Sequence, residues 1–271
     1  MTPLTIGAAL MIEQISVHRD WLFEADRDLE IQDFVPYAAL RDGPQETIAR
    51  AKAALDGFRG RLGIHGPYRG LEIDNADPEI REVILRRYTV AIEAAAAIGA
   101  RQMVIHSPFN IWSHQHRHDG MGRAARMLAD VTALLEPMLA VAEREGVVLV
   151  VENCEDAIPE TRRELVQRIG SLALALSIDT GHAQLSRRMY GAPPVDVFVR
   201  DAGALLRHVH LQDLDGYADR QWAPGDGEIE WPAVFRALAE CESAPHLVLE
   251  LHNHAEVPKG FAYLRDLGLV Q

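Results

Sequence analysis

Four residues that could bind a metal ion stand at the ends of four apolar runs in this chain of 271 residues. Each run is nearly continuous in hydrophobic residues, which is typical of a strand buried on both faces. A charged group at the end of such a strand is costly to bury unless a partner compensates for it. Because the runs follow one another along the chain, we expect these side chains to converge on one site. The four residues are Glu152, Asp179, His210 and Glu250.

Three carboxylates and one imidazole suit a divalent ion such as Mn²⁺, Zn²⁺, Mg²⁺ or Co²⁺, and the residue types do not choose among these metals. The alternative for each residue is a capped or salt-bridged strand end. That alternative is reasonable for one residue alone and much weaker for four successive strand ends.

Several histidines extend this set. His65 and His106 each end an apolar run and precede a proline within two residues, so a stiffened loop could aim them inward, or they could be buried core histidines. His182 is expected on the loop after Asp179, where it could bind substrate or a second metal, or be satisfied by the backbone.

Another histidine, His208, lies two residues before His210, so both point to the same face of a strand. We expect only His210, the one nearer the carboxyl end, to reach the metal.

The remaining histidines are assigned to the surface. His114, His116 and His118 are expected mainly in a solvated loop after the fourth strand, and His252 and His254 as polar residues at the mouth of the fold.

The elements that must position these residues form an alternating series. Strands are predicted at 4–11, 28–34, 61–65, 102–106, 147–152, 174–179, 206–210 and 247–251. Helices are predicted at 78–99, 121–146 (with a kink or break at Pro137), 161–169 and 231–241. Eight strands alternating with helices are typical of an α/β protein with a (β/α)8 TIM barrel, here a single domain over residues 1–271, whose catalytic residues lie at the carboxyl ends of the strands.

Composition excludes several other classes. The net charge of −13 argues against a broad nucleic-acid surface. No apolar run approaches the ~20 residues that a membrane helix needs. The first residues lack the basic region of a secretory signal, and two cysteines do not form a disulfide framework, so a cytoplasmic location is expected. Neither of the two lysines ends a predicted strand, which disfavours a Schiff-base mechanism.

In its motifs the chain resembles the xylose-isomerase-like TIM barrel superfamily, which includes sugar epimerases, hydroxypyruvate isomerases, inosose dehydratases and the endonuclease IV group of abasic-site nucleases. The resemblance runs from about the second strand to the eighth. It depends on the order and spacing of Val151-Glu152-Asn153, Asp179-Thr180-Gly181-His182, His208-Val209-His210-Leu211, the segment 224–231 and Leu249-Glu250.

The resemblance implies roles for individual residues. The four strand-end residues match the metal ligands of the epimerases and isomerases, Glu152 and Glu250 match their acid–base pair, and His182 matches a substrate-binding histidine. In such enzymes a metal polarises a carbonyl and the adjacent hydroxyl while two carboxylates remove and return a carbon-bound proton. The function expected is therefore isomerisation or epimerisation of a small sugar or polyhydroxy carbonyl compound. Tyr68, Phe109 and Trp222 are the expected pocket residues, and a homo-oligomer is left open.

Other members of the superfamily supply the alternatives. His65 and His106 match ligands of an additional zinc in the nucleases, and His182 and Asp219 match two ligands of a third. Gln221 stands where the nucleases have a histidine, so the trinuclear set is incomplete. A dehydratase or lyase would use nearly the same residues, and a non-catalytic binding barrel is the least favoured because it would not need the intact set.

Overall fold

The computed structural model describes residues 4–118 and 120–271, and within them eight parallel strands close into a barrel in sequence order. Each strand pairs with the next, and β8 pairs with β1. This confirms the predicted TIM barrel. The strands are β1 Gly7–Leu10, β2 Leu29–Ile31, β3 Leu62–His65, β4 Gln102–His106, β5 Val148–Glu152, β6 Leu174–Asp179, β7 Leu206–Leu211 and β8 His246–Leu249.

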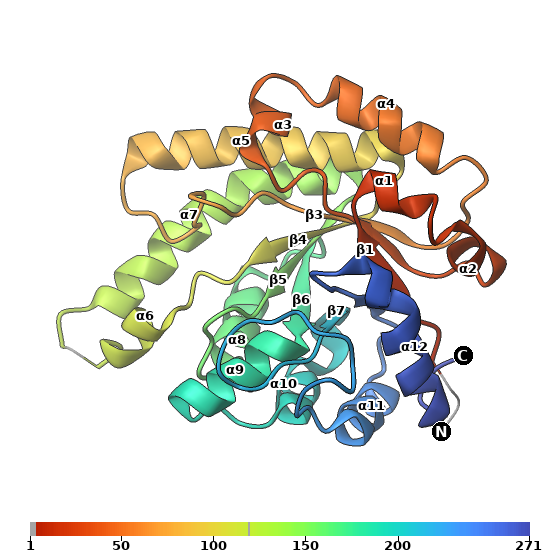
Figure 1. Cartoon of the computed structure of the whole chain (residues 1–271). Helices are drawn as coiled ribbons and strands as arrows, with labels where there is room; N and C mark the ends of the chain where they lie inside the picture. Colours follow the sequence, from red (N-terminus) through yellow and green to blue (C-terminus); the bar gives the residue numbers. More distant parts are fainter. Residues whose placement is uncertain (1–3, 119) are drawn as a thin grey trace.

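Helices surround the barrel, with α4 and α5 on one side of the strands and α9, α10 and α11 on the opposite side (Figure 1). Among the described residues no helix is both long and apolar enough to cross a membrane. The helices are α1 Ile12–Ile15, α2 Arg19–Glu24, α3 Tyr37–Arg41, α4 Gln45–Ala54, α5 Pro78–Ile98, α6 Ile111–Gln115, α7 Arg123–Glu145, α8 Pro159–Ile169, α9 Thr180–Tyr190, α10 Val195–Ala202, α11 Trp231–Glu240 and α12 Val257–Asp266, with 3₁₀ turns η1 Gly203–Leu205 and η2 His254–Glu256.

Helix α7 continues through Pro137, so the alternative of a break there is wrong. Proline removes one hydrogen bond of the helix. Here the helix buries an apolar face on both sides of the proline, including Val131, Leu135 and Met138, and this packing holds the helix together.

The strands present two different faces because successive side chains alternate. Residues such as Met103 and Leu149 face the helices and belong to the main hydrophobic core. Val104, Val150 and Ala175 form a separate small apolar cluster, which alternation places inside the barrel. The acids and histidines follow at the carboxyl ends of the same strands, so they stand on a short apolar layer.

Candidate active site

The four predicted metal ligands lie together at the carboxyl ends of β5 to β8. One ligand atom from each lies within 4.8 Å of the others, and all four residues are buried. Strand register contributes directly, since Asp179 is paired with His210. Glu250 follows the last residue of β8. We refer to Glu152, Asp179, His210 and Glu250 as the cage.

Within the cage the three carboxylates meet at one nitrogen of His210. Its Nδ1 contacts Glu152 Oε1 and lies 3.3 Å from Glu250 Oε2 and 4.0 Å from Asp179 Oδ2. Burial, reinforced by Glu152 and Asp179 and opposed by His210, raises the pKa of Glu250 to about 7. Burial also disfavours the charge on Glu152, but the neighbouring histidines outweigh it and hold the pKa of that carboxyl well below its ordinary value.

The cage fits a divalent cation. Among the described residues, no lysine or arginine forms an ion pair with any of its members, although three of them are buried carboxylates. Buried charges are paired or bind metals because isolated ones are too costly. The donor set of oxygens and one imidazole nitrogen is one that Mn²⁺, Zn²⁺ or Co²⁺ accepts.

Neighbouring side chains hold the carboxylates in place. Gln212 donates from Nε2 to both oxygens of Asp179, at 3.2 and 3.1 Å. Gln32 donates to Glu250 Oε1 at 2.7 Å. Asn153 joins the backbones of β5 and β6, because its side chain donates to the carbonyl of Asp179 and accepts from the amide of Asp179. Sequence reasoning missed these amides.

Glu30 was also missed. Its Oε1 lies 3.0 Å from Nε2 of His210, on the side of the ring that faces away from the cage, and its Oε2 lies 3.2 Å from Nε2 of His208. The signal in the sequence was a single carboxylate between two apolar residues, Leu29 and Ile31, in a short run.

His65 and His106 approach the cage from β3 and β4, and together with Glu152 they form a second group whose ligand atoms lie within 4.8 Å of one another. His106 Nε2 is 3.3 Å and His65 Nε2 is 3.8 Å from Glu152 Oε2. Nδ1 of His65 is 2.8 Å from the carbonyl of Gly66, and the ring of Tyr68 stacks on His106 at 4.1 Å. Burial lowers the pKa of His106 to about 3.

His182 lies in the first turn of α9, so its expected place on a loop is wrong. Asp179 directly precedes this helix and acts as its N-cap, accepting a hydrogen bond of 2.6 Å from the amide of His182. The ring of His182 lies with Nδ1 3.0 Å from the carbonyl of Asn153 and Nε2 3.4 Å from Asp219. The second predicted pair, His182 and Asp219, is therefore in contact beside the cage.

A cavity of about 440 Å³ opens above the cage. Its lining includes Tyr68, Gln221 and His252, together with Arg69 at the rim. Gln221 has a positive φ of 46° although it is not glycine. Its amide donates to the side chain of Gln212, and its carbonyl accepts from the amide of His252. A backbone strained in this way at a site is a reason to look for function.

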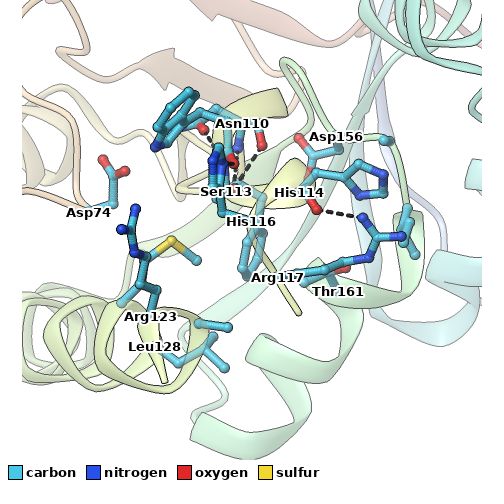
Figure 2. A pocket seen from close by; sticks show the side chains of 16 residues that line it. Asp74, Asn110, Ser113, His114, His116, Arg117, Arg123, Leu128, Asp156 and Thr161 are labelled. Carbon is cyan, nitrogen blue, oxygen red and sulfur yellow. Dashed lines mark hydrogen bonds between the residues drawn. The ribbon is translucent and has the colours of Figure 1, made fainter. Parts of the chain in front are cut away.

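Two predicted pocket residues lie elsewhere. Phe109 lines a second cavity of about 230 Å³ between α6, α7 and the start of α8, together with His114 and His116 (Figure 2). These two histidines belong to or follow the short helix α6, where a loop had been expected. Trp222 lines neither cavity; the guanidinium of Arg220 lies over its ring.

Comparison with known proteins agrees with this fold. The sequence model of the family described as xylose isomerase-like TIM barrel matches residues 26–267. The uncharacterized protein MJ1311 of Methanocaldococcus jannaschii is 24% identical over 220 residues, which is 78% of this chain and 71% of that protein.

Solved structures are similar over nearly the whole chain. A D-tagatose 3-epimerase-like protein superposes with a TM-score of 0.80 at 22% identity, covering 98% of each chain. The 3-keto-D-glucoside 4-epimerase YcjR from E. coli gives 0.72 at 19% identity, covering 97% of this chain and 99% of its own. At these identities the similarity shows the fold.

Proposed function

This chain belongs to the xylose isomerase-like TIM barrel family, and we propose that it is a divalent-metal-dependent isomerase or epimerase of a small sugar or polyhydroxy carbonyl compound. The single observation that carries the proposal is the buried cage of three carboxylates and one imidazole at the carboxyl ends of β5 to β8. Structures named as sugar epimerases share the fold, which supports this choice of substrate class.

The cage residues would have two tasks, metal binding and proton transfer. Glu152, Asp179, His210 and Glu250 would hold the ion, which when bound polarises a carbonyl and the adjacent hydroxyl and so acidifies the neighbouring C–H. Two members of the cage, Glu152 and Glu250, also line the cavity. One of them can therefore remove the proton from the substrate and the other can return it.

The remaining residues at the cavity bind and orient the substrate. His65, His106, His182 and Asp219 present ring nitrogens and a carboxylate that can hydrogen-bond to hydroxyl groups, and Tyr68 supplies an aromatic wall. Phe109 and Trp222, which do not line this cavity, are not part of the proposed substrate contacts.

Proton abstraction can be tested directly. Purified protein loaded with Mn²⁺, Zn²⁺, Mg²⁺ or Co²⁺ is incubated with a panel of ketoses and aldoses in deuterated water, and NMR follows exchange at the carbon beside the carbonyl. We expect metal-dependent exchange for at least one sugar. If no sugar exchanged, yet a duplex with an abasic site was cut in a metal-dependent way, the proposal would be wrong.

One specific observation favours that second candidate. His65, His106 and Glu152 form a further group able to hold an ion, and multi-metal sites suit phosphodiester cleavage. Gln221, which occupies the position where the nucleases have a histidine, and the net charge of −13 count against it. Counting bound ions separates the two: about one per chain favours the isomerase, and two or three favour the phosphodiesterase. A dehydratase or lyase using the same residues would instead release water or a smaller product, which the same NMR spectra would show.

A further inference from the structure

We propose that Glu30 is a positioning residue that fixes His210 with Nδ1 toward the cage and a proton on Nε2, and that His208 holds Glu30 in place for this task. The inference depends on the metal site of the proposed function, but not on the identity of the substrate. It assigns a role to a buried charge that the proton-transfer chemistry does not use.

The contacts cross the interior of the barrel. Glu30 comes from β2 and both histidines come from β7, yet each oxygen of Glu30 reaches one histidine, at 3.0 Å for His210 and 3.2 Å for His208. The three side chains are at most 2% exposed. The backbone positions of β2 and β7 therefore place this carboxylate between the two rings.

Imidazole chemistry explains what the arrangement does. A neutral imidazole has one N–H donor and one lone pair, and the partner of one nitrogen decides which is which. The carboxylate of Glu30 can only accept when ionised. With a cation held by the cage it would therefore keep the proton on Nε2 of His210 and leave the Nδ1 lone pair for that cation. Histidine ligands of metals commonly donate their other N–H to such a carboxylate, which orients the ring and raises its basicity.

His208 has a polar neighbour at each of its nitrogens, although only the contact at Nδ1 has hydrogen-bond geometry. Nδ1 is 2.9 Å from the hydroxyl of Ser177 on β6, and Nε2 faces Glu30. The two histidines of β7 therefore have different tasks, although they share one face of the strand.

A different role is possible for the same atoms. Ligand atoms of Glu30, His208 and His210 also lie within 4.8 Å of one another, which would allow them to hold an ion themselves. This would make Glu30 a ligand instead of a positioning residue. The number of bound ions distinguishes the two roles.

The experiment compares wild type with Glu30→Gln, Glu30→Asp and Asp28→Asn. Asp28 is a matched control because it is a buried carboxylate only two residues before Glu30. It pairs with Arg61 at 2.7 Å and not with the histidines. Titration calorimetry with Zn²⁺ and with Mn²⁺ on metal-free protein gives affinity and stoichiometry. We expect Glu30→Gln to weaken binding by about 10- to 100-fold at unchanged stoichiometry, Glu30→Asp to lie between it and wild type, and Asp28→Asn to keep wild-type affinity even if its thermal stability falls.

A second readout needs only the wild-type protein, so it holds even if the variants fail to fold. With histidine labelled by ¹⁵N and Zn²⁺ bound, NMR should show His210 with a proton on Nε2 and the metal on Nδ1.

Several results would overturn the inference. These are wild-type affinity in a folded Glu30→Gln variant, the loss of one of two bound ions in that variant, or metal on Nε2 of His210. A wild-type protein that binds no divalent ion overturns both this inference and the proposed function. Metal binding that depends on Glu30, without exchange in any sugar, overturns only the proposed function.

Discussion

The two sides of the mouth are built differently. On the side of β5 to β8, all four cage residues are buried, and three of them are held by a side chain from outside the cage. Gln212 holds Asp179, Gln32 holds Glu250 and Glu30 holds His210. On the side of β3 and β4, the side chain of His106 is 27% exposed and its ring rests against Tyr68. A fully supported group suits an ion that demands fixed ligand positions, whereas the less constrained group suits a substrate that arrives and leaves.

The largest loss of activity is expected at Glu152 and Glu250, the two cage residues that are also proposed to transfer the proton. Glu152→Gln and Glu250→Gln keep the shape of the side chain but cannot carry a proton, so hydrogen exchange in a reactive sugar should fall by about 100- to 10,000-fold. Calorimetry should show that some metal binding remains. NMR in deuterated water measures the exchange.

The control is Glu155→Gln, since Glu155 is an exposed carboxylate of the loop after β5. Full exchange activity in either cage variant would remove our assignment of the proton-transfer pair.

Removal of the metal should have the next largest effect, a fall in thermal stability. This fall should depend on the cage residues and not on the histidines of β3 and β4. An ion present at 100 times its dissociation constant stabilises the folded state by about 2.7 kcal/mol, which for a protein of this size corresponds to a Tm difference of about 5 to 10 °C. Differential scanning fluorimetry with and without a chelator measures it. Asp179→Asn should abolish most of the difference, and His106→Ala should leave it intact. A difference that vanishes in His106→Ala would place the ion on the histidine side.

A smaller effect is expected on the histidine side. His106→Ala should raise KM for the sugar by about tenfold or more, the cost of losing one hydrogen bond of about 1.5 kcal/mol, without changing the number of bound ions. His114→Ala is the comparison, because that ring lines the second cavity. Elemental analysis and steady-state kinetics measure both quantities. A fall from two ions to one in His106→Ala would show that this side binds metal as well.

The smallest effect concerns Gln221, which lines the cavity. Gln221→Gly relieves a strained backbone but removes a side chain from the cavity, so we expect a change in unfolding free energy of no more than about 1 kcal/mol and a raised KM. Asp26 has the same positive φ of 46° and does not line the cavity, so Asp26→Gly should change stability alone. An unchanged KM in Gln221→Gly would mean that its side chain does not touch the substrate.

Features that depend on one stretch of sequence could be predicted, and contacts between distant strands could not. Barrel and cage were predictable because long apolar runs end in Glu152, Asp179 and His210, and this signal lies within each run. Glu30 was not, because β2 has only three residues and its one inward side chain is the acid itself. Contacts such as that of Gln212 with Asp179 exist only once the strands are adjacent, so no local pattern reports them.

The misplacement of His182 has a local cause that the sequence did contain. Aspartate is a favoured N-cap, and an aspartate three residues before His182 could have indicated a helix that begins directly after the strand. The prediction treated Asp179 only as a metal ligand.

Asp179 caps α9 through Oδ1, while Oδ2 faces His210 in the cage, so the cap and the proposed metal role fall on one side chain. In evolutionary terms the position is constrained twice. A longer glutamate could still reach an ion but would misplace the cap, and an asparagine could still cap the helix but would lose the charge. We therefore expect substitutions at cavity residues such as Tyr68 and Gln221 to be tolerated by the fold, and the last residue of β6 to tolerate very few.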